Sequence, residues 1–262
     1  MSEHKEIVCP ICNSSDFEEL THLPPKAVKC KYCGLGIECS LTADPVNVYK
    51  SKNYDNVIRN YGNGGSRWSR FHHDSSVSVK RLEQLSKYIS HIQNTPKVWL
   101  DVGCSNGAFL STARRYGWQV RGVEADVDNA KEVMELLGIT TIPYSTWMIS
   151  MLNSNDSPMA NCVSLFDVLE YVLDPVSTII AACNSLKNGG VLVLEVPDFD
   201  TASGDFINWK HRRCSNTVTE HIWHFSENSL DTLVKKASQN TRVVGVNRPV
   251  PTKLQMVWEK RV

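Results

Sequence analysis

Apolar runs and helical patterns alternate along the chain from residue 96 onward. Four runs are apolar at nearly every position, which is typical of strands buried on both faces: Val98–Val102, Val120–Val123, Cys162–Phe166 and Val191–Val196. Segments with helical spacing of apolar residues lie between them, at Ala108–Tyr116, Asp128–Leu137 and Pro175–Leu186. This alternation predicts an α/β fold, in which helices cover a parallel sheet.

Further elements flank these strands and helices. Val77–Ile92 has the spacing of an amphipathic helix, and Asn94-Thr95-Pro96 is expected to end it. Toward the carboxyl terminus, a helix is predicted near Glu227–Ala237. Two strand-like runs follow, Val243–Val246 and Leu254–Trp258, and we expect this pair to close one edge of the sheet.

Charge and hydropathy limit the partners that the chain can take. Its 262 residues carry 28 basic and 28 acidic side chains, which disfavours a broad nucleic-acid-binding surface. Lys210–Arg213 is the one local basic patch singled out, and a solvated loop is the alternative for it. No apolar run approaches the roughly 20 residues that a membrane helix needs. Because the first six residues are polar, without a signal-peptide core, we expect a cytoplasmic protein without membrane contact.

Cysteines near the amino terminus are spaced as metal ligands. Two Cys-x-x-Cys pairs are separated by 17 residues. The four cysteines are Cys9, Cys12, Cys30 and Cys33. This spacing predicts a tetrahedral zinc site, which would be structural because four thiolates leave no open position. Unrelated pairs of reduced thiols are the alternative, and a redox site is disfavoured because neither pair sits in a βαβ pattern. The remaining cysteines are interpreted as bystanders.

These patterns divide the chain into three parts. Residues 1–40 are expected to form a small zinc-ribbon-like module that depends on its metal to fold. Residues 41–95 are helical and aromatic, and serve either as a lid over a ligand or as a helix packed on the sheet with a loose connection. Residues 96–262 form the α/β domain.

The turn after the first strand predicts a nucleoside site. Gly103 and Gly107 lie on either side of it, and glycine lets the backbone approach a ligand closely. Glu124 ends the next strand, where a carboxylate can accept two hydrogen bonds from a ribose diol. A dinucleotide enzyme needs Gly-x-Gly-x-x-Gly, and Ser105 and Ala108 break that pattern. The spacing therefore disfavours NAD.

The motifs, in this order, resemble those of class I S-adenosylmethionine-dependent methyltransferases, in particular the small-molecule subgroup. The matching segments are Leu100–Gly107, Val123–Asp126, Phe166–Pro175, Leu186–Leu192 and Glu220–Leu233. The resemblance implies a Rossmann-like sheet of seven strands whose last strand is antiparallel. It also implies the methionine part of the donor near Gly103 and Ala108, ribose on Glu124, and adenine between Ala125 and the region of Trp147.

Donor contacts follow from the same resemblance. The residues implied are Asp101, Gly103, Cys104, Ser105, Gly107, Phe109, Glu124, Ala125, Asp167 and Leu169. Two features depart from the family pattern. Ser105 stands where the family usually has its middle glycine, and no acidic third motif follows Thr140–Ile142.

Candidate acceptor-side residues follow the later motifs. His221 and His224 are candidate bases, three positions apart, so that they would share one face of a helix. Tyr171 stands where many family members have histidine, and it is the next candidate. The alternatives are that one histidine stabilises a turn, that the other lies at the surface, and that Tyr171 packs over the donor.

The acceptor is expected to be a small polar molecule. The Asp/Asn-Pro-Pro-Tyr tetrapeptide of amino-methylating nucleic-acid enzymes is absent, as is a Pro-Cys pair after the strand 162–166. The leading hypothesis is O-methylation, or C-methylation, of a sugar, sugar nucleotide or polysaccharide precursor. A second hypothesis is RNA methylation, with RNA held by Lys26, Lys29, Lys31 and Lys210–Arg213. A third is a donor-binding module without transfer activity. The sequence does not specify the methylated atom or the oligomeric state.

Overall fold

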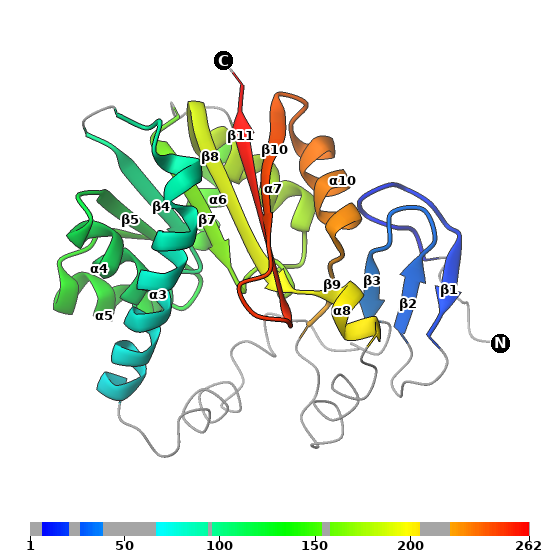
Figure 1. The fold of residues 1–262 in the computed structure, drawn as a ribbon, viewed down its shortest axis with the longest axis horizontal. Coiled ribbons are helices and arrows are strands. Elements are labelled where there is room, and N and C mark those ends of the chain that lie inside the picture. Colours follow the sequence, from blue (N-terminus) through cyan, green and yellow to red (C-terminus); the bar gives the residue numbers. More distant parts are fainter. Residues whose placement is uncertain are drawn as a thin grey trace.

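The protein is described here from a computed structural model. The described residues are 7–20, 27–38, 67–93, 96–153, 158–204 and 221–261. Two sheets are present among them, one of seven strands and one of four. Figure 1 shows the larger sheet flanked by helices, with the smaller sheet lying beside it.

The larger sheet has the strand order β10-β11-β8-β7-β4-β5-β6. Its strands are β4 (Val98–Val102), β5 (Gln119–Glu124), β6 (Thr141–Pro143), β7 (Ala160–Phe166), β8 (Leu186–Pro197), β10 (Thr241–Asn247) and β11 (Lys253–Lys260). Strands β4 to β8 are parallel to one another, whereas β11 is antiparallel to both β8 and β10. The predicted α/β class, the seven strands and the antiparallel last strand are therefore confirmed.

Helices cover both faces of this sheet. One face is covered by α3 (Arg67–Ile89) and α4 (Ala108–Arg115), whose apolar side chains pack with Trp99. The other face is covered by α6 (Tyr144–Leu152), α7 (Pro175–Ser185) and α10 (Glu227–Ala237). Helix α5 (Val127–Leu137) packs with α4 beside β5. Helix α3 begins at Arg67, ten residues before the predicted start at Val77. The prediction began late because the apolar spacing of residues 67–76 is weak.

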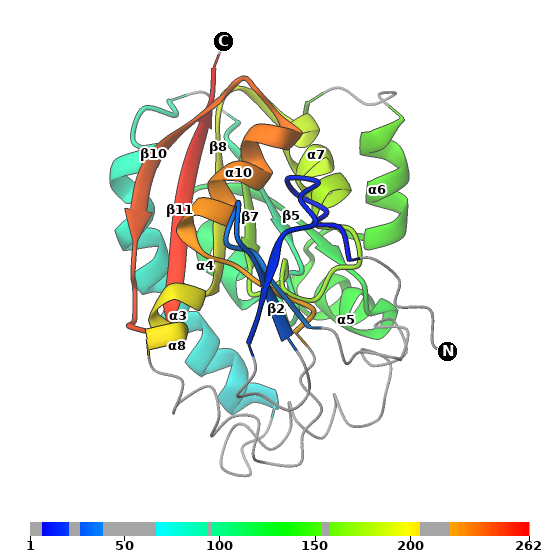
Figure 2. The same ribbon diagram turned by 90° about the vertical axis from the view of Figure 1, so that its right-hand side faces the viewer.

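The amino-terminal segment forms a small antiparallel sheet with a strand from the other end of the chain. Strands β1 (Phe17–Glu19), β2 (Ala27–Cys30) and β3 (Gly36–Glu38) are followed in this sheet by β9 (Trp223–His224). Its apolar residues belong to the same core as those of α7 and α10. Figure 2 shows this sheet in front of α10, close to the short helix α8 (Phe199–Gly204). The structure thus joins the predicted metal module to the 221–225 segment.

Several sequence features lie outside the described residues. They include the aromatic connection up to residue 66, Lys26 and the Lys210–Arg213 run. Within the described part of the chain, no helix is both long and apolar enough to cross a membrane.

Candidate functional site

The turn between β4 and α4 has an unusual backbone at three positions. Gly103, Ser105 and Gly107 have φ angles of 76°, 48° and 74°. A Cβ atom on Gly103 would lie 2.3 Å from a methyl group of Val168, and one on Gly107 would lie 2.8 Å from Leu137. Both positions therefore require glycine for space as well as for backbone angle. Ser105 adopts the same left-handed region with a side chain.

Glu124 closes this turn from the neighbouring strand. It is 2% exposed, and its Oε2 accepts a hydrogen bond from the Ser105 amide at 2.7 Å. Its Oε1 accepts bonds from the amides of Ala125 and Asp126 at 2.9 and 3.0 Å. These donors fix the carboxylate at the carboxyl end of β5, beside the turn that follows β4. The two motifs singled out in the sequence are therefore in direct contact.

Helix α3 reaches the same turn from residues that the sequence analysis left outside the site. The Asn106 amide donates to Asp74 Oδ2 at 2.8 Å, and Asn106 Oδ1 accepts from the Ala108 amide at 3.1 Å. Asp74 lies in the half of α3 that precedes the predicted helix start at Val77. The segment before the α/β domain thus supports the loop directly.

The other residues predicted to contact a donor lie close to this turn, but most of their side chains are buried. Cys104, Phe109 and Leu169 are at most 5% exposed and belong to the hydrophobic clusters. Asp101 is 3% exposed and accepts a 2.6 Å hydrogen bond from Ser164. Burial raises the pKa of Asp101 to about 7. These buried side chains pack beneath the turn.

The side chain of Trp147 is buried in the hydrophobic core. Its side chain is 1% exposed, and its indole N–H donates to Ser185 Oγ at 3.1 Å, between α6 and α7. The indole is part of the core because α6 turns its apolar face toward α7. The adenine contact expected in the region of Trp147 stays a prediction.

Charged residues meet at the carboxyl ends of β7 and β8, and of these the sequence analysis had selected only Asp167. Arg81 of α3 forms an ion pair with Glu195 at 2.5 Å and a longer one with Asp167 at 3.6 Å. Lys253 of β11 pairs with Asp167 from the other side, and Gln255 donates to Glu195 at 2.8 Å. Asp167 has a φ of 57°, which turns the chain sharply after β7. Arg81 occupied a polar position of an amphipathic helix, so no sequence signal distinguished it.

The three predicted catalytic residues are brought together after β7 and at β9. The Tyr171 hydroxyl and His221 Nε2 are 2.8 Å apart, and their rings meet edge to face. The rings of His221 and His224 are 6.3 Å apart. His224 is 6% exposed and stacks on Phe199. The prediction that His221 and His224 share one face of a helix is wrong, because residues 221–225 are not helical and His224 belongs to β9.

Glu170 precedes this tyrosine, and among the described residues neither of its buried carboxylate oxygens has a hydrogen-bond partner. Glu170 as a whole is 1% exposed. Burial raises the pKa of Glu170 to about 8, and the nearby charge of Asp167 acts in the same direction, whereas Lys253 lowers it. Such a carboxyl group holds its proton in neutral solution. It lay inside the quoted motif, but its burial was not evident from the sequence.

The four predicted metal ligands converge on one point. All four Sγ atoms lie within 4.8 Å of one another, and the Cys9–Cys33 and Cys12–Cys30 pairs are each 3.5 Å apart. A tetrahedral ion with Zn–S bonds of about 2.3 Å would separate its sulfur atoms by about 3.8 Å. None of these cysteines forms a disulfide. The donor set therefore fits zinc in both chemistry and spacing.

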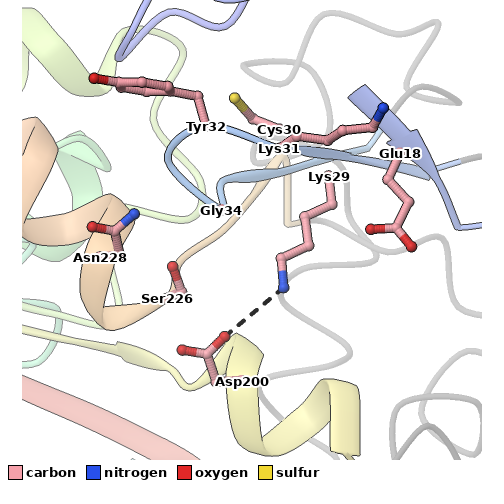
Figure 3. Close-up of a pocket in the computed structure, with 9 residues that line it drawn as sticks. All are labelled: Glu18, Lys29, Cys30, Lys31, Tyr32, Gly34, Asp200, Ser226 and Asn228. Carbon is pink, nitrogen blue, oxygen red and sulfur yellow. Dashed lines mark ion pairs between the residues drawn. The ribbon is translucent and has the colours of Figure 1, made fainter. Parts of the chain in front are cut away.

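A polar cavity of about 350 Å³ lies between the small sheet, α8 and α10. Figure 3 shows Lys29 pointing toward Asp200 across it, at an N–O distance of 4.0 Å. Lys31 pairs instead with Asp16 at 2.8 Å. Of the basic residues named in the RNA hypothesis, the two that the structure describes thus have acidic partners.

A family model described as a methyltransferase domain matches residues 71–238. A ubiquinone biosynthesis O-methyltransferase from Alkalilimnicola ehrlichii is 24% identical over 160 residues, which are 57% of this chain and 63% of that protein. A tRNA U34 carboxymethyltransferase from Desulfotalea psychrophila is 28% identical over 126 residues, 45% of this chain and 37% of that protein. The chain thus spans less than two thirds of the length of these relatives.

The fold has counterparts among solved structures. The magnesium protoporphyrin IX methyltransferase from Synechocystis PCC 6803, solved with bound SAH, superposes with a TM-score of 0.58 at 14% identity. The superposition covers 83% of this chain and all of that one. At this identity the likeness concerns the fold, and the family match covers more than half of the chain. The chain belongs to the methyltransferase domain family, with the class I S-adenosylmethionine-dependent fold that its motifs resembled.

Proposed function

We propose that this protein transfers a methyl group from S-adenosylmethionine to an oxygen atom, or alternatively a carbon atom, of a small polar acceptor. The observation that carries the proposal is the arrangement at one edge of the sheet. The Gly103–Gly107 turn with Glu124 lies after β4 and β5, and the Tyr171–His221 pair lies after the adjacent β7. In open α/β sheets, ligands bind at the carboxyl ends of the strands, where the strand order reverses.

Donor binding is assigned to the turn after β4 and to Glu124. The carboxylate, held by three backbone amides, would receive the ribose hydroxyls. The glycines would let the methionine part of the donor pass close to the backbone. The side chains of Asp101 and Phe109 would support this surface from below, since both are buried. Asp167 and Leu169 would complete it from the β7 side.

Methyl transfer from the donor is an in-line displacement. The carbon–sulfur bond breaks while the bond from the acceptor oxygen to the methyl carbon forms, and S-adenosylhomocysteine leaves. Because the donor is already activated, much of the rate enhancement comes from positioning. A hydroxyl acceptor also loses a proton, and the Tyr171–His221 pair is the group that would take it. His224, which lies in β9 just after His221, would support the pair.

The acceptor class is inferred from charge and from the local ion pairs. A sugar, sugar nucleotide or polysaccharide precursor fits a chain of zero net charge whose Lys29 and Lys31 face acidic residues. The O-methyltransferase name of several relatives supports transfer to oxygen. The four cysteines would hold a structural zinc ion, in a module assigned to residues 1–40. A connecting segment at 41–95 and the methyltransferase domain at 96–262 complete the proposed division.

Isothermal titration with S-adenosylhomocysteine tests the donor assignment. Zinc-loaded protein is expected to bind one equivalent, and Glu124→Ala is expected to weaken binding at least about tenfold, because two ribose hydrogen bonds are lost. Glu135→Ala, on the exposed side of α5, is the matched control and should bind as the wild type does. Well-folded wild-type protein that binds no donor would contradict the proposed function.

Transfer is tested with radiolabelled methyl donor and a panel of sugars and sugar nucleotides. Once an acceptor is found, His221→Ala and Tyr171→Phe should lower kcat by about 10²-fold or more while leaving donor affinity unchanged. His91→Ala, at an exposed position after α3, is the control. Donor binding with no acceptor in a broad metabolite screen would favour the third hypothesis, a binding module without transfer activity.

RNA methylation is the second candidate, favoured by the tRNA-directed relative. It requires phosphate contacts, so RNA affinity should fall steeply with added salt. Filter binding of bulk tRNA between 50 and 200 mM salt separates the two candidates. A fall of about 10³-fold or more would favour RNA, whereas weak, salt-insensitive binding favours a small acceptor.

A further inference from the structure

We propose that the metal module positions the Tyr171–His221 pair. Strand β3 of the module holds the segment 221–225 in place, so that metal binding supports the acceptor side of the site and not the donor side. The statement that this pair faces an acceptor rests on the proposed function. The structural link between the metal and the segment does not.

One side of the segment pairs with the module. Gly36 stands opposite His224 and Ile37 opposite Trp223 in the antiparallel β3–β9 ladder. The pairing continues one residue further, because the Glu38 amide donates to the Ile222 carbonyl at 3.0 Å. β9 has only two residues, and a strand pair of this length has little stability by itself.

The other side of the segment pairs with the chain after β7. The amides of Ile222 and Trp223 both donate to the Glu170 carbonyl, at 2.8 and 3.3 Å. The Trp223 indole N–H donates to the Val172 carbonyl at 2.7 Å. Residues on both sides of Tyr171 are therefore bound by the strand that the module holds. A shift of β9 would move His221 relative to the Tyr171 hydroxyl.

The metal ligands themselves are tied to the helix that follows β9. Asn228 in the first turn of α10 donates to the Cys33 carbonyl at 3.0 Å. Lys236 in its last turn donates to the Pro10 carbonyl at 2.8 Å. Each Cys-x-x-Cys turn thus has a contact to α10. Because a module of this size depends on its metal for stability, metal loss should release both contacts and the β3–β9 pairing.

Close packing at Gly36 makes the link sensitive to a single methyl group. A Cβ atom there would lie 2.9 Å from His224 Cβ and 2.9 Å from the Phe199 ring. A larger side chain would therefore push β3 away from β9 without touching a cysteine. The Gly103–Gly107 turn follows β4 and is held by hydrogen bonds to Glu124 of β5 and Asp74 of α3, with Gly103 packed against Val168 after β7.

Hydrogen–deuterium exchange of the full chain, with and without zinc, tests the link. Removal of zinc by a chelator should raise amide exchange in residues 221–225 about tenfold or more, because loss of the β3 pairing frees the segment to move and so weakens the bonds of the Ile222 and Trp223 amides to the Glu170 carbonyl. The affinity for S-adenosylhomocysteine should stay within about twofold. The ¹⁵N resonances of the His221 imidazole should shift as its bond to Tyr171 is lost.

Gly36→Val repeats the test with all four cysteines in place. It should retain one zinc per chain, as measured by a colorimetric metal assay, and still show fast exchange at 221–225. Gly245→Val is the matched control. Gly245 lies on β10, away from the module, and a Cβ atom there would lie 2.2 Å from the Tyr88 side chain. It should destabilise the chain without changing exchange at 221–225 relative to the rest. Unchanged exchange at 221–225 in both zinc-free protein and Gly36→Val would overturn the proposal. Because amide exchange, zinc content and the imidazole resonances need neither donor nor acceptor, they stand apart from a failure of the proposed function.

Discussion

Ser105 combines a family position that usually has glycine with a left-handed backbone. At a φ of 48°, a residue with a side chain pays a conformational penalty that glycine avoids. Its amide nevertheless donates to Glu124, so the loop keeps its shape. The departure noted in the sequence is therefore a matter of local strain and not of a different loop.

Ser105→Gly should raise the free energy of unfolding by up to about 1 kcal/mol, since the relief of strain outweighs the extra freedom of the unfolded chain. Urea denaturation measures the change. Ser111→Gly, the same substitution within α4, should lower the free energy of unfolding by about 0.5 kcal/mol. A loss of stability in Ser105→Gly would show that the side chain contributes more than the backbone strain costs.

Glu170 makes stability depend on pH in a direction opposite to that of a paired carboxylate. Its pKa rises to about 8 in the folded protein, mainly through burial, from an ordinary value near 4.5. Below the lower value the group is protonated in both states. Between the two values the folded protein binds the extra proton, so wild-type stability falls as pH rises toward 8.

Glu170→Gln should therefore gain stability relative to the wild type as pH rises from 5 to 8, by up to about 1.4 kcal/mol per pH unit, and the difference should level off above pH 8. Urea denaturation at four pH values gives the slope. Glu135→Gln on the exposed face of α5 is the control and should show no such trend. A constant difference between Glu170→Gln and wild type would mean that the carboxyl group is already ionised in the folded protein.

At the scale of elements, α3 is joined to the sheet by charge as well as by apolar packing. Leu82 and Leu85 of α3 pack on the sheet. Arg81 of the same helix pairs with Glu195 of β8, which is 3% exposed. The apolar spacing of this helix was sufficient to predict its existence. Its start was not predictable, because Arg67–Ser76 lacks an apolar stripe, and neither was the ion pair, which depends on a strand 114 residues away.

Arg81→Met should lower the free energy of unfolding by about 3–5 kcal/mol, because Glu195 would be left buried with Gln255 as its remaining polar partner. Lys80→Met, at the adjacent exposed position, should change it by less than about 0.5 kcal/mol. Equal effects of the two substitutions in urea denaturation would show that the ion pair contributes no net stability.

At the scale of the molecule, local patterns were sufficient for the sheet and the metal ligands. Strands β4, β5, β7 and β8 are apolar runs, and the four cysteines are recognisable by spacing alone. The join between the module and the 221–225 segment was not predictable. It pairs β3 with β9, two strands of three and two residues that lie far apart in the sequence, and neither has an alternating pattern.

In Figure 1, β5, which ends at Glu124 of the proposed donor site, and strands β1 to β3 of the module lie on opposite sides of the molecule. Two sites without shared partners should contribute independently to stability. Saturating S-adenosylhomocysteine, at about 100 times its dissociation constant, should stabilise the wild type by about 2.7 kcal/mol.

Asn228→Ala should lower the free energy of unfolding by about 1 kcal/mol, through the lost bond to Cys33, and keep the full ligand effect. At the same ligand concentration Glu124→Ala, whose affinity is expected to fall at least about tenfold, should keep at most about 1.4 kcal/mol of the ligand effect. The double variant should be additive within about 0.5 kcal/mol. Thermal unfolding of the four proteins with and without ligand measures these terms. A ligand effect that shrinks in Asn228→Ala would mean that the module acts on donor binding as well, which contradicts a role restricted to the acceptor side.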